Sequence, residues 1–576
     1  MTYRHQARLG AESLALTVTK NRDSVTCLLH ILCISLLIVG IILLINPFRS
    51  VLLGDDSIYV RTVQRLSERG ILRLSPAITP AFVFQDFWGW LFTLPFGFSI
   101  SAVISSVPPL ALLGLLAFYW TLVTMCQSRS VALLGTLAIL TSPLYTRLLA
   151  SFMTDVPFLS LMLISVYFYV SALKSGGKRE LFLGSVGMSF ALLTRQVGIG
   201  IAAAIFSALL YRTLSTRRVP WSDLAAALLL PMLTFLGYQF WLHYSKGETW
   251  EQGYIVSHVT TDFFRQWQLP LRLAYDLARY SVFMVLLLIP FFTARSRRVA
   301  ECFRAALAHP FQLGVLIGVA LILDRAFSPP GAPLFWLEGV LYWMGLKFAR
   351  GIWAPIALLL LISGIALAKS ELGQLLKRAA NGSLKSEAFF LVTLITIFLI
   401  MSSLLPGQYR SDRYVLPIFP LVGLLWLSHS NGQPAKIHLP VIVMIISLAL
   451  GVWATRFNYD VAEIQWEEAD RLVASGVRRE DIRGNWGWEG WHFWDPCLEL
   501  MIASGQARTA KLDCWQSNAS TPYKIKLYSV LGRTIRDVDY GYIVTRFIPL
   551  QTFWIPAQVA VMVNRASLPP AQRELI

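Results

Sequence analysis

Charged residues are scarce in this 576-residue chain, where Asp, Glu, Lys and Arg make up 14% of the sequence and hydrophobic residues 55%. So little charge excludes an ordinary soluble multidomain protein and indicates a polytopic membrane protein. Acidic residues are the rarer sign, with 33 Asp and Glu against 50 Lys and Arg, for a formal net charge of +17. The basic residues form short clusters between apolar runs, the pattern that orients helices in a bilayer, so we exclude nucleic acid as a partner.

Several signatures of known chemistry are missing. No His-x-x-x-His or Cys-x-x-Cys spacing occurs, so we assign no metal site. Nucleotide-dependent chemistry has no visible site either, because the chain lacks a phosphate-cradling glycine loop and a Gly-x-Ser-x-Gly turn. No repeat of fixed period is present, so the two-halves pattern of many transporters receives no support.

Cysteine is also rare, with six residues in the whole chain. Four of them fall in expected membrane spans or on the expected cytoplasmic side, where disulfides are uncommon. The other two, Cys497 and Cys514, lie in the C-terminal tail, which we expect outside the cytoplasm. Because that compartment is oxidising, we predict that these two residues form a disulfide.

Apolar stretches of about bilayer length recur as far as residue 455 and predict thirteen spans. They are centred on residues 25–45, 102–124, 130–148, 156–173, 181–194, 197–213, 223–242, 275–293, 310–324, 352–368, 387–404, 414–429 and 439–455. The aromatic segment 81–99 is interrupted by Asp86, Pro95 and Gly97, so we predict an interfacial helix there instead of a further span.

The charge pattern predicts the topology. The run 25–45 is longer than the apolar region of a signal peptide and follows basic residues, so we expect a retained anchor with a cytoplasmic N-terminus. The short basic connectors at 174–179, 212–218, 295–298 and 369–385 then all face the cytoplasm, as the positive-inside rule requires. A span at 81–99 would turn all of them outward.

Three regions follow from this topology: a cytoplasmic N-terminus (1–24), a transmembrane domain (25–456) whose first outer loop is 46–101, and an extracytoplasmic tail (457–576). In the tail, 461–474 has the pattern of an amphipathic helix, and 524–530, 541–547 and 558–563 have the pattern of strands. A small α/β domain of this size can bury its own core. The tryptophans in Trp486–Trp494 either form that core or stack on a sugar ring.

An acidic pair, Asp55 and Asp56, follows the first span and begins a predicted helix that ends at Gly70. Arg61 and Arg65 recur on one face of this helix at a spacing of four. Carboxylates beside arginines at a membrane surface can hold a lipid phosphate and take a proton from a hydroxyl. The structural alternative is a helix cap followed by a solvated arginine row.

Three other polar positions lie at the outer ends of expected spans. Asp155 either caps a helix or grips a sugar hydroxyl or a divalent ion beside the lipid phosphate. Arg195 interrupts an apolar stretch, which favours either a phosphate partner or snorkelling to the membrane rim. Arg410, Arg413 and Tyr414 present the same choice before a late span, with pairing between Arg413 and the adjacent Asp412 as the alternative.

Four short motifs carry a family resemblance: Asp55-Asp56-Ser57-Ile58-Tyr59, Thr154-Asp155-Val156-Pro157, Leu193-Thr194-Arg195-Gln196 and Asp412-Arg413-Tyr414-Val415-Leu416-Pro417. Over about 25–455 the chain resembles the GT-C superfamily of membrane glycosyltransferases. Within it, the chain is most similar to the protein-O-mannosyltransferase and aminoarabinose-transferase-like enzymes, which include bacterial lipopolysaccharide sugar transferases. The resemblance implies an all-α polytopic fold of about 13 transmembrane helices with a small extracytoplasmic α/β C-terminal domain.

The resemblance also implies an activity. Such enzymes use a polyprenyl-phosphate sugar as donor and the first residue of the acidic pair as catalytic base, a role that goes here to Asp55 with Asp56 as its neighbour. The family pair is often Asp-Glu, so Asp-Asp leaves the division of labour open. The acceptor is a hydroxyl of a lipid, glycan or protein, and transfer is inverting. The expected substrate-binding residues are Asp155, Arg195, Arg61, Arg65, Arg410, Arg413 and Tyr414.

The resemblance places the enzyme in the bacterial inner membrane, among membrane lipids, with its active site on the extracytoplasmic side. No cofactor is assigned, and a divalent cation remains open. Three alternatives compete with this function. A transporter or flippase of lipid-linked sugars needs charges at mid-membrane depth. A polysaccharide polymerase or ligase depends on a large outer loop, for which 243–274 is the candidate. A sensor would be controlled by Trp486–Trp494 instead of Asp55.

Overall fold

The structure is a computed structural model of the whole chain. It describes residues 2–75, 82–126, 128–216, 221–244, 269–294, 296–327, 350–381, 384–404, 412–428, 437–494, 497, 500, 514, 522–530, 533–534, 542–552 and 555–564.

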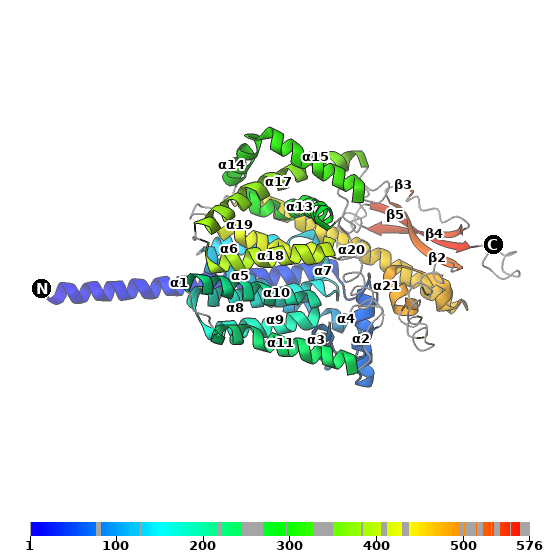
Figure 1. Cartoon of the computed structure of the whole chain (residues 1–576). Coiled ribbons are helices and arrows are strands. Elements are labelled where there is room, and N and C mark those ends of the chain that lie inside the picture. The colour runs from blue at the N-terminus through cyan, green and yellow to red at the C-terminus, as the bar shows by residue number, and fades with distance from the viewer. Residues whose placement is uncertain are drawn as a thin grey trace.

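Long apolar helices run alongside one another and form most of the molecule (Figure 1). They are α1 (Thr2–Ile45), α5 (Val107–Cys126), α6 (Arg129–Leu140), α7 (Pro143–Leu149), α8 (Asp155–Ser175), α9 (Lys178–Thr194), α10 (Ile199–Thr216), α11 (Trp221–Tyr244), α13 (Leu269–Ala294), α15 (Pro310–Phe327), α17 (Arg350–Ala380), α18 (Ser386–Leu404), α19 (Ile418–Ser428) and α20 (His438–Ala474). The amphipathic α14 (Ser296–Leu307) lies beside α15 and α17.

The chain is a multi-pass membrane protein, but the expected number of thirteen spans is not confirmed. Within the described residues, six helices are long and apolar enough to cross a membrane, or up to eight if each of two bent pairs is one span. One of these pairs is α6 with α7, which meet at 69°. In the aromatic segment 81–99, the described residues 82–99 contain α3 (Val83–Thr93), which is too short to span a bilayer and is followed by α4 (Ile100–Ile104).

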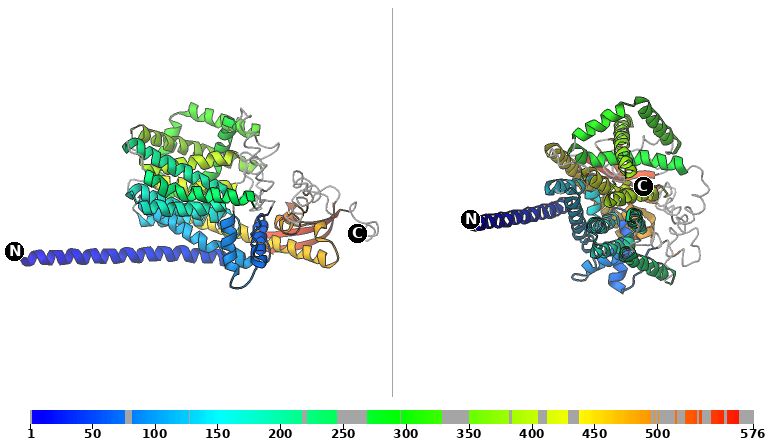
Figure 2. Two further views of the ribbon diagram at one scale, coloured as in Figure 1. Left: turned by 60° about the horizontal axis from the view of Figure 1, so that its bottom comes forward. Right: turned by 60° about the vertical axis from the view of Figure 1, so that its left-hand side comes forward.

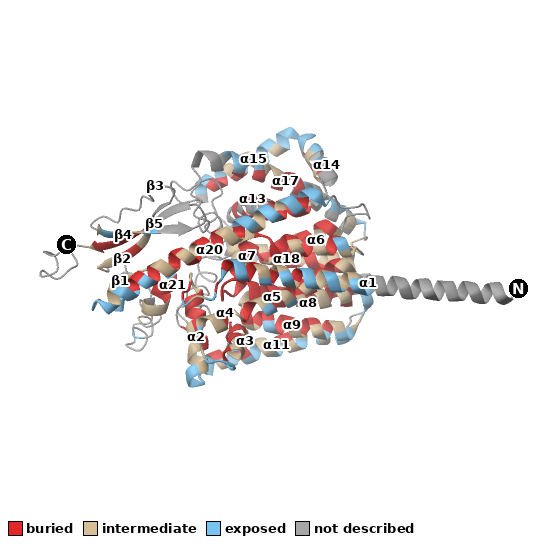
Figure 3. Cartoon of the chain, turned by 180° about the vertical axis from the view of Figure 1, so that it is seen from behind, coloured by how far each residue is buried: buried red, intermediate tan, exposed pale blue. Residues whose placement is uncertain are grey.

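Burial follows the pattern expected in lipid. Buried residues line the inside of the bundle, while exposed apolar side chains cover its outer faces (Figure 3). Leu233 of α11, Ile322 of α15 and Ile445 of α20 are 57%, 70% and 61% exposed. In water such a surface would promote aggregation, whereas lipid tails satisfy it.

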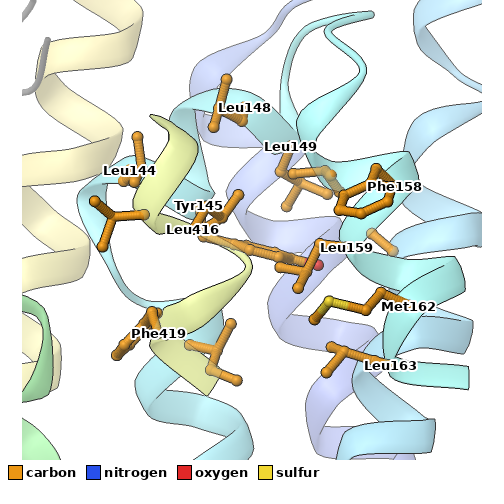
Figure 4. Packing of buried hydrophobic residues seen from close by; sticks show 14 of the residues in the cluster. Leu144, Tyr145, Leu148, Leu149, Phe158, Leu159, Met162, Leu163, Leu416 and Phe419 are labelled. Atoms are coloured by element: carbon orange, nitrogen blue, oxygen red, sulfur yellow. The ribbon is translucent and has the colours of Figure 1, made fainter. Parts of the chain in front are cut away.

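A dense apolar cluster holds two segments that carry candidate site residues (Figure 4). Leu416 and Phe419 follow the 3-10 turn η4 (Asp412–Val415), and Phe158 and Leu159 lie in the first turns of α8. All four side chains are less than 2% exposed and pack around Tyr145 of α7. Because close-packed cores resist displacement, η4 and the start of α8 are fixed relative to each other.

The C-terminal end of α1 lies at the end of the bundle that carries α2 (Asp56–Arg69) and the β-sheet (Figure 2). Figure 2 shows α2 at the same end of the bundle as the β-sheet, with the N-terminus of α1 at the opposite end. As predicted, Gly70 ends α2 in the left-handed conformation (φ 67°), and its N–H donates to the carbonyl of Leu66. Arg49 ties this region to α20 through ion pairs of 2.7 Å to Asp460 and Glu463.

Helix α20 is 37 residues long, so the span expected at 439–455 and the amphipathic helix expected at 461–474 form one element. Its second half leaves the bundle and supports a five-stranded sheet (Figure 1). The strands are β1 (Ile482–Arg483), β2 (Tyr523–Val530), β3 (Arg533–Thr534), β4 (Tyr542–Thr552) and β5 (Ile555–Asn564). β2 and β5 contain the predicted strands 524–530 and 558–563, and β4 contains 542–547 of the predicted strand 541–547, whose first residue lies outside the described residues.

The sheet has the order β1-β2-β5-β4, with β3 paired to β2. β2, β5 and β4 are antiparallel neighbours, and β1 is parallel to β2. Gln465 of α20 fastens the helix to the sheet by donating from Nε2 to the carbonyl of Ile525 at 3.1 Å. In the tail, Cys497 and Cys514 form a disulfide with a Cα–Cα distance of 6.0 Å.

Candidate functional site

Asp55 lies at the turn before α2, but its carboxylate does not cap the helix. Oδ2 accepts from Nη2 of Arg413 at 2.9 Å, and Oδ1 accepts from Nε1 of Trp486 at 2.9 Å. The Asp55 and Arg413 side chains are 30% and 25% exposed. The carboxylate is therefore oriented by two donors from distant parts of the chain and still reaches solvent.

Asp56, the first residue of α2, has a different environment. It is 1% exposed, and its Oδ1 accepts from the Gly54 N–H at 2.8 Å. Burial raises the pKa of its carboxyl to about 6, and the neighbouring charge of Asp55 adds to this. The hydrogen bond from Gly54 and, to a smaller extent, the charge of Arg147 lower the pKa. Of the two carboxylates, Asp55 is the more accessible to a substrate.

The second acidic position is already paired. Oδ1 of Asp155, the first residue of α8, lies 2.5 Å from Nη1 of Arg195. The same nitrogen lies 3.3 Å from Oγ1 of Thr154. Arg195 sits at the break between α9 and the short turn η1 (Gln196–Gly198), which leaves its extended backbone outside both helices. The Asp155 side chain is 3% exposed, against 20% for Arg195.

Tyr414 links the two acidic positions. The Arg195 guanidinium lies 5.2 Å from the centre of the Tyr414 ring, and that of Arg413 lies 5.6 Å from it. Such distances are typical of cation–π contacts. Asp55, Arg413, Tyr414, Arg195 and Asp155 thus form one connected group, which we call the carboxylate–arginine cluster.

The buried phenol of Tyr59 lies within the electrostatic reach of this cluster. Desolvation raises the pKa of Tyr59, and four charges of the cluster also act on it. Asp55 and Asp155 raise the pKa, whereas Arg413 and Arg195 lower it. The charges of two carboxylates and two guanidinium groups therefore act on one buried side chain.

Other predicted site residues lie elsewhere. The guanidinium of Arg61 donates to the carbonyl of Trp491 and lies 5.5 Å from the Trp491 ring centre. Arg65, one turn further along α2, is half-buried. Arg410 lies outside the described residues. For a metal, the part of the chain that the structure describes offers no group of three or more His, Cys, Asp or Glu side chains.

The sequence analysis gave Tyr59 and Arg147 no role at this site, and it left Trp486 between the core of the tail and stacking on a sugar ring. Tyr59 follows the acidic pair in the predicted helix, whereas Arg413, Arg195 and Asp155, whose charges act on it, come from other elements. Trp486 belongs to an aromatic, glycine-rich segment, and that composition was a usable signal. Its partner was not predictable, because Asp55 is 431 residues away in the sequence.

Comparison with known proteins was made for both sequence and structure. Residues 83–238 match the family model described as dolichyl-phosphate-mannose-protein mannosyltransferase. This match confirms the resemblance to GT-C glycosyltransferases and the prediction of an enzyme of the glycosyltransferase class. The matched segment contains Asp155 and Arg195 and does not extend to Asp55. No curated protein matches the chain.

Several solved structures have a similar backbone fold. ArnT from Cupriavidus metallidurans bound to undecaprenyl phosphate matches with a TM-score of 0.40 and 13% identity, over 91% of this chain and 97% of that one. The same protein in the apo state gives 0.39 and 13%, over 91% and 97%. The arabinosyltransferase EmbB from Mycobacterium smegmatis gives 0.32 and 12%, over 90% of this chain and 45% of that one.

Proposed function

We propose that this membrane glycosyltransferase moves a sugar from a polyprenyl-phosphate donor to a hydroxyl of a lipid, glycan or protein acceptor. The observation that carries the proposal is the 2.9 Å contact between Asp55 and Arg413, in a cluster with Arg195 and Asp155. A partly exposed carboxylate beside two guanidinium groups provides a base next to an anion site. The family model matched over 83–238 names a lipid-phosphate sugar, which agrees with this donor class.

The proposed reaction is a single inverting displacement. Asp55 accepts the proton of the acceptor hydroxyl as its oxygen attacks the anomeric carbon of the donor sugar. The bond between that carbon and the phosphate oxygen breaks, and its electron pair leaves with the polyprenyl phosphate. Arg413 and Arg195 stabilise the negative charge on the departing phosphate. Because phosphate is a good leaving group once its charge is stabilised, one carboxylate suffices.

Arg413 has two roles in this scheme. Without substrate its guanidinium pairs with Asp55, and an anionic phosphate competes for the same donors. Binding of the donor therefore frees Oδ2 of Asp55 for the acceptor hydroxyl. Arg195 stays oriented by Asp155 throughout, because that ion pair is more deeply buried. This pairing also favours Arg195 over a divalent cation as the partner of Asp155.

We further propose that the cluster faces the extracytoplasmic side of a bacterial inner membrane and that residues 457–576 form a domain there. Two observations support this orientation. The basic connectors at 174–179 and 212–218 are predicted to be cytoplasmic, and Gly176 lies beside Arg212 at the end of α8 opposite Asp155. The cluster and the sheet share the other end of the bundle.

A panel experiment tests the proposed function. Purified protein in lipid nanodiscs is incubated with radiolabelled polyprenyl-phosphate sugars of different headgroups, together with a mixture of envelope acceptors. The wild-type protein and the Asp470→Asn variant, which changes an exposed carboxylate of α20, should consume one donor. Asp55→Asn should consume none. Equal consumption by Asp55→Asn would overturn the assignment of the base.

Transport is the main competing function and makes a different prediction. The described residues include two fully buried acids in apolar helices, Asp276 in the first third of α13 and Asp324 in the last turn of α15. Neither lies at the middle of its helix, where a transport site is expected. Movement of an intact lipid-linked sugar across vesicles without its consumption would favour transport.

A further inference from the structure

Trp486 brings the C-terminal tail into contact with Asp55. Its indole Nε1 donates to Oδ1 of Asp55 at 2.9 Å, while the Trp486 side chain as a whole remains 48% exposed. Trp488, two residues further on, is 0% exposed. Trp486 thus combines a half-exposed ring with a hydrogen bond to the carboxylate.

The contact is held in place by a close fit of two glycines, one against backbone and one against a side chain. A Cβ atom added to Gly487 would overlap the carbonyl oxygen of Leu52, and one added to Gly490 would overlap Oγ of Ser57. The short helix α21 (Trp486–Glu489) and the π-helical turn η6 (Gly490–Trp494) thus lie directly against the segment that carries Asp55. Only glycine permits so close an approach at these two positions.

The position of Trp486 is fixed from behind as well. Oδ1 of Asn485 accepts from the Trp488 N–H at 2.7 Å and from Nε1 of Trp466 at 3.0 Å. Trp466 belongs to α20, and its ring packs edge-on against that of Trp488 with centres 5.3 Å apart. Contacts from Trp466 of α20 through Asn485 therefore fix the segment whose Trp486 bonds to Asp55.

The two donors to Asp55 differ in a way that matters for catalysis. Arg413 is cationic and is the group for which a donor phosphate competes. Trp486 is neutral, and its indole N–H can only donate, so an anionic ligand has much less attraction for it. Once Arg413 turns to the phosphate, the Trp486 bond is the one that keeps the carboxylate in place.

We propose that Trp486 is a positioning residue for the general base, so that the tail completes the active site. This inference rests on the proposed function of Asp55. Trp486 holds Oδ1 and leaves Oδ2 to accept the proton of the attacking hydroxyl. A carboxylate held in one orientation reacts faster than one that rotates, because it loses less conformational entropy when the transition state forms.

The test is the Trp486→Phe variant, which keeps an aromatic ring and removes the N–H. We expect kcat to fall on the order of ten- to a hundredfold, as for a lost hydrogen bond to a charged group, with the KM of the lipid donor changed by less than about threefold. Because hydrogen bonds to a carboxylate favour its ionised form, the acidic limb of the pH–rate profile should move to higher pH.

The pH readout separates positioning from a merely structural effect. The charged or titratable groups that act on Asp55 include Arg413 of η4, and Asp56 and Tyr59 of α2, and Trp486→Phe changes none of these. Trp221→Phe is the matched control, because Trp221 is 74% exposed at the start of α11. It should retain the wild-type rate and profile.

The outcomes distinguish this inference from the proposed function. If Asp55→Asn is inactive and Trp486→Phe has wild-type kcat and pH profile, the positioning role is wrong and the base assignment stands. If Asp55→Asn is fully active, the proposed function fails first. If Trp486→Phe does not fold, benzothienylalanine at 486, which has the shape of Trp with sulfur in place of N–H, provides the same test.

Discussion

Two adjacent carboxylates at the start of α2 differ in exposure and in hydrogen-bond partners because their surroundings differ. Asp55 keeps 30% of its side chain exposed and is oriented by Arg413 and Trp486, whereas Asp56 is buried and receives a backbone N–H. The sequence Asp55-Asp56 predicts both as candidates and cannot separate them. One step along a helix turns a side chain by about a quarter of a turn, and the partners on each side come from remote segments.

Asp56 should make stability depend on pH. Its pKa is raised to about 6, so the folded chain binds more protons than the unfolded chain between the ordinary carboxyl pKa and about pH 6. The stability present below pH 4 is therefore lost as the pH rises through 6, by roughly 3 kcal/mol. Thermal unfolding in detergent at several pH values measures this. Asp56→Asn should flatten the dependence, and Asp470→Asn should leave it unchanged.

The Asp155–Arg195 pair should behave as a buried ion pair. Removing either charge strands the other, so Asp155→Asn and Arg195→Met should each lower the free energy of unfolding by roughly 3 kcal/mol. The double variant should recover part of this loss. Arg478→Met, which breaks an exposed pair with Asp481, should cost less than about 1 kcal/mol. Strict additivity of the two single variants in thermal unfolding would contradict this coupling.

At the scale of elements, local sequence signals predict where a helix ends, but they do not predict which other element it packs against. Gly70 marks the end of α2, as glycine in the left-handed conformation commonly does. The tail strands were recognisable from their β-branched and aromatic residues. The continuity of α20 was not predicted, because a span and an amphipathic surface helix carry different patterns even when one helix contains both. The docking of α21 on the segment before α2 has no local signal beyond its glycines.

The glycine at 487 should be necessary for this docking. Its added Cβ would overlap backbone atoms, which cannot move as a flexible side chain can, so Gly487→Ala should separate α21 from the Leu52–Ser57 segment. We expect transfer to fall at least as far as in Trp486→Phe and the melting temperature to drop. Gly237→Ala is the matched control, because nothing lies within 4 Å of a Cβ at that helical position. Wild-type activity in Gly487→Ala would contradict the tight fit.

For the whole molecule, composition predicts an apolar helical bundle, and the structure has one. The number of spans was harder to predict, because hydropathy detects apolar length but not bends. The run at 130–148 is divided by a 69° bend between α6 and α7, and α19 is only 11 residues long. The grouping of Asp55, Asp155, Arg195 and Arg413 depends on how these helices pack. No periodicity in a single segment encodes that packing.

The orientation of the whole molecule can be measured by cysteine labelling. In a background without the four free cysteines, Ser475→Cys places an exposed thiol after the end of α20, and Ser175→Cys places one at the end of α8 opposite Asp155. A membrane-impermeant maleimide should label Ser475→Cys in intact cells and Ser175→Cys only after permeabilisation. Labelling of both thiols from the same side would contradict the proposed topology.

The rate of a single turnover tests the role of Asp55 most directly. With the identified donor bound to excess protein, transfer is followed by rapid quench in the wild type, Asp55→Asn and Asp470→Asn, and donor affinity is measured separately. Loss of a general base predicts that Asp55→Asn transfers roughly 10²- to 10⁴-fold more slowly, with donor affinity equal to or above that of the wild type. A single-turnover rate in Asp55→Asn within a few-fold of the wild type would contradict the account.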